Sequence, residues 1–396
     1  MLVTCHPEPQ LFFAKEFHLM VTAQRKPSLV VIQLSGGNDA MNTIVPYTNG
    51  IYHDSRKAIH LTEDKVIDLN GTLGLNPSMG PMKSLWDAGK VAIVQGVGYP
   101  KPNRSHFRSM DIWHTAESDH IANSGWLGRT IRELDPEGKN VITGINFGRG
   151  LPRALHAKGV PVASVGNLET YGLMPDIADR MTRETAVDVF ARMYGPDDTR
   201  DAVLQQISET GIGAYLGADI LRTAPKQYSS PIEYEGVPIA QSLRDISQVL
   251  LADVGTRVFY TQHAGYDTHA GELENHAQLW HELSTAVNDF IADLDEHGRG
   301  DDAVVMIFSE FGRRIQDNGS GTDHGSGGVA FVLGNPVKGG LYGEYPSLDP
   351  SEQLEGDMKF NNDFRGIYAT VLDQWMGVNP QTILNHNYEQ FDMIRR

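Results

Sequence analysis

The chain has 396 residues, of which 40% are hydrophobic and 21% charged, so it is long enough and apolar enough to bury one large core. Its formal net charge of -17 repels polyanions and therefore excludes nucleic acid as an expected partner. No apolar run has the length of a membrane span, and the single cysteine, Cys5, excludes an intramolecular disulfide.

Residues 1–27 are interpreted as an N-terminal extension of the folded chain. Glu8, Lys15 and Glu16 interrupt its apolar residues, so the segment lacks the continuous apolar region of a secretory signal. As written, the sequence predicts a cytoplasmic protein. Met20 is an alternative start, and an incomplete N-terminus would leave periplasmic export open.

Continuous apolar runs bounded by polar residues predict strands that are buried on both faces of a mainly parallel sheet. These runs cover residues 28–34, 91–98, 140–147, 257–263, 302–311 and 328–334. Apolar residues at helical spacing over 274–298 and 362–377 predict amphipathic helices. The alternation predicts a doubly wound α/β domain over residues 28–396, with a helical insertion around 175–225.

Polar residues that follow the predicted strands are the first candidates for a site, because ligands bind beyond the carboxyl ends of parallel strands. Asp39 lies in the glycine-rich turn after the first strand, where it can bind a metal or cap a helix. Asp267 and His269 are two residues apart in an extended segment, and they offer one oxygen and one nitrogen ligand.

Glu310 ends a strongly apolar strand, where a carboxylate must be paired or must bind a cation. Arg313 and Arg314 are the alternative partners in an ion pair. Asp323 and His324 follow in a glycine-rich loop before the next strand. Such a set of oxygen and imidazole ligands suits a divalent cation, with zinc preferred and manganese or magnesium as alternatives.

The loop 101–109 carries the candidate catalytic residues. Ser105 is a candidate nucleophile, and His106 is a candidate base or a further metal ligand. Arg104 and Arg313 are candidates for stabilising an oxyanion. The alternative interpretation is a polar surface loop in which Ser105 caps the helix that follows.

Six motifs occur in a characteristic order: SGGNDAMNTIVPY, NRSHF, GYDTH, FSEFGRR, GTDHG and NDFRGIYATVLDQWMG. Together they resemble the DUF1501 family, which is placed in the alkaline phosphatase superfamily, from about residue 28 to about residue 385. The resemblance implies an alkaline-phosphatase-like three-layer α/β/α sandwich with a mainly parallel central sheet. It also implies a centre that binds two divalent metal ions.

By this resemblance, Asp39, Glu310 and Ser105 would surround one metal. Asp267, His269 and His324 would hold the other, with Asp323 nearby. The superfamily usually has Asp-His where this chain has Glu310 followed by Phe311, so one site lacks a nitrogen ligand. Thr43 and Ser109 remain alternatives to Ser105 as the nucleophile.

The leading hypothesis is a metal-dependent hydrolase of phosphate or sulfate esters of a small molecule or a glycan. Either Ser105 or a metal-bound hydroxide would attack in line. The alternative is a non-catalytic protein that binds a partner or a glycan on the same fold. A metal-free serine hydrolase is disfavoured because no G-x-S-x-G surrounds Ser105.

Overall fold

The computed structural model describes residues 26–168 and 228–395, together with isolated positions between 171 and 226. Nine strands of this described part form the central sheet. They are β1 (Ser28–Ser35), β5 (Val91–Gly98), β6 (Gly144–Phe147), β7 (Ala163–Val165), β8 (Val258–Ala264), β9 (Ala303–Ser309), β12 (Gly328–Leu333), β13 (Gly340–Tyr342) and β14 (Asn362–Asp363). Their order is β13-β5-β12-β9-β1-β8-β6-β7, and β14 also pairs with β5.

The sheet is mainly parallel, as predicted. β1 pairs in parallel with both β8 and β9, and β6 pairs in parallel with β8 and β7. β12 is antiparallel to both of its neighbours, β9 and β5. Since two reversals restore the direction, β5 runs the same way as β9. The carboxyl ends of β1, β5, β8 and β9 therefore share one edge of the sheet.

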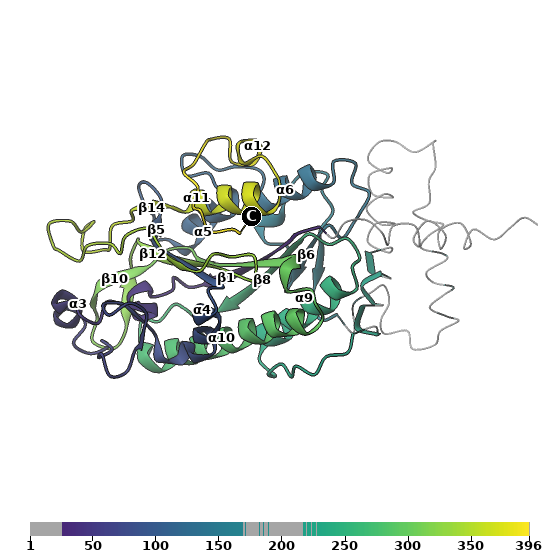
Figure 1. Cartoon of the computed structure of the whole chain (residues 1–396). Helices are drawn as coiled ribbons and strands as arrows, with labels where there is room; N and C mark the ends of the chain where they lie inside the picture. Colours follow the sequence, from purple (N-terminus) through teal and green to yellow (C-terminus); the bar gives the residue numbers. More distant parts are fainter. Residues whose placement is uncertain are drawn as a thin grey trace, which may run out of the picture.

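Helices cover both faces of the sheet (Figure 1). One face carries α5 (His106–Thr115), α6 (Trp126–Leu134), α11 (Phe364–Thr370) and α12 (Pro380–Leu384), and the other carries α4 (Gly80–Asp87), α9 (Pro238–Leu251) and α10 (Glu272–Glu296). Side chains of β1 alternate between the two layers, because Val30 and Ile32 join one hydrophobic cluster and Leu29 and Val31 join the other. The predicted three-layer α/β/α class is confirmed.

Two predicted elements differ in extent from the structure. The strand predicted over 140–147 is reduced to β6, because the Asn140 side chain accepts a hydrogen bond from the Ile142 amide (3.1 Å) and starts a turn. The helix predicted over 362–377 begins with β14, continues as α11 and ends in a π-helical turn, Val371–Trp375.

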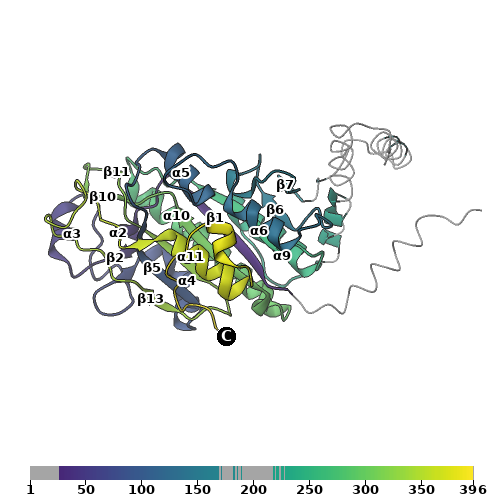
Figure 2. The ribbon, with the colours of Figure 1, turned by 90° about the horizontal axis from the view of Figure 1, so that it is seen from above.

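Short elements gather beyond the carboxyl edge of the sheet. β10 (Arg313–Asp317) and β11 (Thr322–His324) form an antiparallel hairpin, and Figure 2 shows it at the end of the molecule that carries α2 (Ala40–Thr43) and α3 (Gly50–Ser55). A small antiparallel sheet is formed by β2 (Ile44–Val45), β4 (Gly74–Leu75) and β3 (Ile67–Asp68). These segments bring polar side chains to the ends of β1, β8 and β9.

Most of the predicted extension, 1–27, and most of the predicted insertion, 175–225, lie outside the described residues. The division into one domain with an extension and an insertion therefore stays a prediction. Among the helices that are described, none combines the length and the apolar character needed to cross a bilayer. The cytoplasmic location also stays a prediction.

Candidate metal centre

Three predicted side chains from three separate loops converge at the carboxyl edge of the sheet. His106 is the first residue of α5, Asp267 follows β8, and His324 ends β11. Each offers one ligand atom, and these atoms all lie within 4.8 Å of one another. His269 adjoins this group, because its Nε2 atom lies 3.1 Å from Nε2 of His324.

The Asp267 carboxylate lies at the centre of this group and contacts all three histidines. Its Oδ1 atom lies 3.1 Å from Nε2 of His269 and 3.1 Å from Nε2 of His324, and its Oδ2 atom lies 3.6 Å from Nε2 of His106. Donor atoms bound at about 2.0–2.1 Å around a tetrahedral zinc ion lie about 3.3 Å from one another. The spacing around Asp267 is therefore close to what one divalent ion requires.

His106 is held with its Nε2 atom toward Asp267. Its Nδ1 atom lies 2.8 Å from Oε1 of Glu310, and its Nε2 atom is buried without a hydrogen-bond partner in the described part of the chain. A histidine that binds a metal through one nitrogen is usually fixed by a carboxylate or carbonyl at the other. An unpaired buried nitrogen is costly, so a cation at this position would satisfy it.

The other two histidines are held in the same way. Nδ1 of His324 lies 2.9 Å from the backbone carbonyl oxygen of Arg104, and Nδ1 of His269 lies 3.1 Å from Oδ1 of Asp323. Both Nε2 atoms are thereby directed at Asp267. His106, Asp267 and His324 fit the ligand set of one divalent ion, and His269 adjoins them. Glu310 and Asp323 each lie against the Nδ1 atom of a histidine of this cluster, and direct binding of a metal by either carboxylate stays a prediction.

Glu310 is buried at the end of β9, with only 2% of its surface exposed. Its Oε1 atom accepts hydrogen bonds from the Gly36 amide (2.8 Å) and faces His106, and its Oε2 atom accepts one from the Ser309 hydroxyl (3.1 Å). Hydrogen bonding to Glu310 raises the pKa of His106 above its ordinary value, although burial opposes this shift. Among the bonds and ion pairs of the described residues, none joins Glu310 to Arg313 or Arg314.

Arg313 is fully buried and hydrogen-bonds to the loops after β1 and β8 and to β11. Its guanidinium donates to Oδ1 of Asp267 (2.7 Å) and to four backbone carbonyl groups. Those carbonyls belong to Gly36, Gly37, Tyr266 and Thr322. Burial alone would raise the pKa of Asp267, but Arg313, together with His324 and His269, outweighs it and the net pKa is lowered, so Asp267 is a carboxylate at neutral pH. This geometry supports a positioning role; oxyanion stabilisation by Arg313 stays a prediction.

Arg104 and Ser105 lie at the start of α5. The Arg104 guanidinium contacts the buried Asp357 through Nε (2.9 Å) and Nη2 (2.8 Å). Ser105 occupies the position before the helix and is exposed, yet its side chain makes no capping hydrogen bond. Its hydroxyl is thus not engaged by the helix that it precedes. The alternative nucleophiles Thr43 and Ser109 are fully buried and hydrogen-bonded to backbone carbonyls, so their hydroxyls face the interior.

Asp39 lies in a different environment from the three histidines. It is fully buried, and both of its carboxylate oxygens accept hydrogen bonds from the Arg56 guanidinium. Burial alone would raise its pKa, but Arg56, together with the neighbouring Glu272 and His276, outweighs that effect, and the pKa of Asp39 is far below its usual range. Sequence reasoning missed Arg56, because its loop position gives no signal that it pairs with Asp39.

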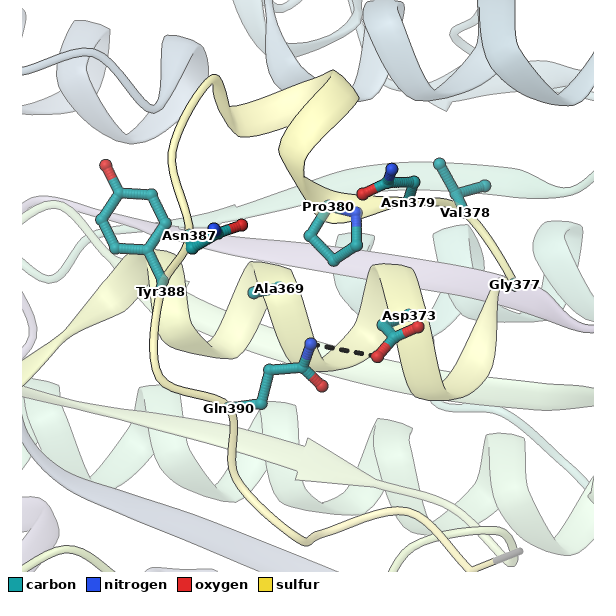
Figure 3. A pocket seen from close by; sticks show the side chains of 9 residues that line it. All are labelled: Ala369, Asp373, Gly377, Val378, Asn379, Pro380, Asn387, Tyr388 and Gln390. Atoms are coloured by element: carbon teal, nitrogen blue, oxygen red, sulfur yellow. Dashed lines mark hydrogen bonds between the residues drawn. The ribbon is translucent and has the colours of Figure 1, made fainter.

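Two hollows of the described surface lie away from the metal centre. One, of about 440 Å³, is bounded by α11, α12 and the C-terminal segment (Figure 3), where the Gln390 amide donates to Asp373 (3.0 Å). The other, of about 420 Å³, lies beyond β6, β7 and β8, with Arg149 and Arg244 in its lining. None of the predicted site residues lines either hollow.

Fold and site together define an α/β sandwich protein with a cluster of imidazole and carboxylate groups at the carboxyl edge of its sheet. The chain belongs to the DUF1501 family, whose model is described as a protein of unknown function and matches residues 26–389. The family predicted from the six motifs is confirmed. No curated protein sequence matches the chain.

Solved structures with a similar chain course have low sequence identity. A PsFucS1 sulfatase from Pseudoalteromonas sp. is 12% identical, with a TM-score of 0.42, and the match covers 98% of this chain and 75% of that one. A protein in the alkaline phosphatase superfamily from Vibrio parahaemolyticus is 9% identical, with a TM-score of 0.39 and coverage of 92% and 71%. The C-terminal periplasmic domain of EcEptC from Escherichia coli, in complex with Zn, is 8% identical, with a TM-score of 0.37 and coverage of 79% and 74%.

Proposed function

We propose that this protein is a metal-dependent hydrolase of phosphate or sulfate esters. The observation that carries the proposal is the convergence of His106, His269 and His324 on the Asp267 carboxylate, each imidazole fixed through Nδ1. Three nitrogen ligands favour zinc, with manganese as the alternative, and make magnesium the weaker choice. A divalent ion held there would polarise an ester oxygen and lower the pKa of a bound water molecule.

The start of α5 would receive the anionic ester group. The first backbone amides of this 10-residue helix carry partial positive charge, and Ser105 precedes them with its hydroxyl exposed. The guanidinium of Arg104 lies at the same end of the helix, where it is paired with Asp357 (2.8 Å) and lies 3.6 Å from a Glu355 carboxylate oxygen. Attack of water on phosphorus or sulfur would displace the alcohol part of the ester, with a proton of the water passing to the alcohol oxygen. Attack by Ser105 would displace the same alcohol and leave a serine phosphate or sulfate ester, which a water molecule would then hydrolyse to restore the serine.

A small-molecule or glycan ester is the proposed substrate class. Phe107, next to His106, is 92% exposed and offers an aromatic face against which a sugar ring could pack. The net charge of -17 means that an anionic ester must be attracted locally, by the cation and by the first amides of α5, rather than by the molecule as a whole.

The first experiment measures metal content and ester hydrolysis together. Protein purified without added metals or chelators is expected to contain a divalent metal and to hydrolyse aryl phosphate or aryl sulfate esters. His324→Ala should lose both properties, whereas His281→Ala, which removes an exposed histidine of α10, should lose neither. An absence of bound metal, even after reconstitution with zinc or manganese, contradicts the proposal.

Ser105→Ala separates catalysis from binding. If Ser105 is the nucleophile, hydrolysis should fall by at least about a hundredfold while metal content is unchanged. If water attacks directly, the loss should be small. A chain that binds metal but hydrolyses neither class of ester would favour the alternative, a non-catalytic protein that binds a partner or a glycan.

A further inference from the structure

The family resemblance implies two cations, with Asp39, Glu310 and Ser105 around one of them. A cation site needs several oxygen or nitrogen atoms whose lone pairs point into one space. Whether Asp39 and Glu310 meet this condition can be decided from their hydrogen-bond partners.

The lone pairs of Asp39 are already used within the protein. Both oxygens accept from the Arg56 guanidinium, with Nη2 at 2.9 Å from Oδ1, and Oδ1 also accepts from the Met41 amide at 3.2 Å. A carboxylate with this many donors on two oxygens has little capacity left for a metal.

Arg56 is itself fixed and fully buried. Beyond Asp39, its Nε atom donates to the carbonyl of Ile315 (3.1 Å) and its Nη2 atom to the carbonyl of Arg314 (2.8 Å), both in β10. A guanidinium stays protonated at any ordinary pH. A divalent ion at Asp39 would therefore face a permanent positive charge that has no route to solvent.

Glu310 does not turn toward Asp39 either. Its oxygens accept from the Gly36 amide and the Ser309 hydroxyl and face His106, which belongs to the other group of ligands. The residues assigned to one metal thus fall into two separate sets of contacts, one around Arg56 and one around His106.

We infer that this chain binds one divalent cation, through His106, Asp267, His269 and His324, and that the Arg56 guanidinium takes the place of a second cation at Asp39. Arg56 is then a positioning residue. By binding Asp39 and β10 together, it fixes the hairpin whose second strand, β11, ends at His324.

This inference rests on the metal centre of the proposed function, but its test needs no substrate. The full chain would be stripped of metal, loaded with excess zinc, desalted and weighed by native mass spectrometry. We expect one zinc per chain in the wild type, none in His324→Ala, and one in Asp39→Asn. Two zinc ions per wild-type chain, or none, would overturn the inference, as would loss of zinc in a folded Asp39→Asn.

Asp39→Asn removes the carboxylate bound to Arg56, whose other acidic neighbour, Glu272, lies 4.0 Å away, and the variant can fail to fold, so a second variant is required. Arg56→Met combined with Asp39→Asn removes both charges and should still bind one zinc, provided that its circular dichroism spectrum matches the wild type. If neither variant folds, the wild-type zinc count decides alone. One zinc per chain without ester hydrolysis would refute the proposed function and leave this inference standing. Two zinc ions per chain with ester hydrolysis would refute this inference and support the proposed function.

Discussion

Glu272 is a buried carboxyl group that packs against a second carboxyl group, Asp39. It accepts hydrogen bonds from the Thr322 hydroxyl (2.6 Å) and the Asn42 amide (3.3 Å). Burial, and then the neighbouring Asp39 charge, raise the pKa of Glu272 to about 9. Glu272 is therefore protonated at neutral pH in the folded chain and ionised in the unfolded chain, where its pKa is about 4.3.

This difference makes stability depend on pH. Between about pH 4.3 and about pH 9 the unfolded chain binds fewer protons at this residue, so its contribution to stability decreases as the pH rises. Glu272→Gln, which stays neutral, should flatten the dependence by up to about 1.4 kcal/mol per pH unit. Urea unfolding in the presence of a chelator gives the free energy of unfolding of the wild type and of Glu272→Gln at each pH from 5.5 to 8.5. Equal slopes would show that Glu272 is ionised in the fold.

In the proposed metal centre, Glu310 would act through His106, whose Nδ1 atom lies 2.8 Å from its Oε1 atom. Glutamine has nearly the same shape as the Glu310 side chain but carries no negative charge. The charge holds the His106 imidazole in its orientation and makes its other nitrogen a stronger metal ligand. We expect Glu310→Gln to weaken zinc affinity by about 10- to 100-fold. A chelator competition titration measures the change. Glu282→Gln is the matched control, because Glu282 also contacts a histidine, His263 (3.3 Å), outside the centre.

At the scale of the elements, the site depends on loops that approach each other very closely. The turn after β1 packs against the loop after β8, where the Tyr266 amide donates to the carbonyl of Ser35 (3.1 Å). Gly36 has a φ of +125°, and a Cβ atom there would lie 2.3 Å from the backbone nitrogen of Asp267. Only glycine allows this approach without moving the loop that carries Asp267.

Gly36→Ala should destabilise the protein by about 2–4 kcal/mol, because it adds a steric clash to an unfavourable φ. It should also weaken zinc binding by displacing Asp267. Gly71→Ala is the control, since Gly71 has a φ of +82° and open space around the Cβ position, and it should cost about 1–2 kcal/mol. Denaturant unfolding of the three proteins gives the comparison. Equal losses in the two variants would show that the contact with Asp267 is unimportant.

At the scale of the whole molecule, the metal centre joins three separate parts of the chain. The helix α5 supplies His106, the loop after β8 supplies Asp267 and His269, and the β10-β11 hairpin supplies His324. A cation bound to all of them favours the folded state, because the unfolded chain does not hold these ligands together.

Metal removal should therefore lower the melting temperature. Zinc at a hundred times its Kd should add about 2.7 kcal/mol of stability, which a chelator should abolish and added zinc should restore. Scanning calorimetry of the wild type with and without chelator tests this. The same experiment on His324→Ala should show no shift. A chelator effect of equal size in that variant would place the bound metal elsewhere.

Much of the architecture could be predicted from local pattern. The apolar runs at 28–34, 91–98 and 257–263 match β1, β5 and β8 closely, because strands buried on both faces need continuous apolar residues. The expectation that polar residues from separate strand ends and loops lie close together is met by His106, Asp267 and His324, which converge at one edge. The loops after β1, β5, β8 and β9 share an edge because these four strands run in the same direction.

The pairing of charges was decided by the tertiary structure alone. Asp39 and Glu310 looked equivalent, as carboxylates that follow buried strands, but Asp39 meets Arg56 and Glu310 meets His106. The antiparallel direction of β12 could not be predicted either, because its apolar run has the same pattern as the runs of the parallel strands. Composition and periodicity determine which residues are buried and which end a strand, because those depend on each residue and its neighbours. The partner that satisfies a buried charge depends on which distant segments are packed against it.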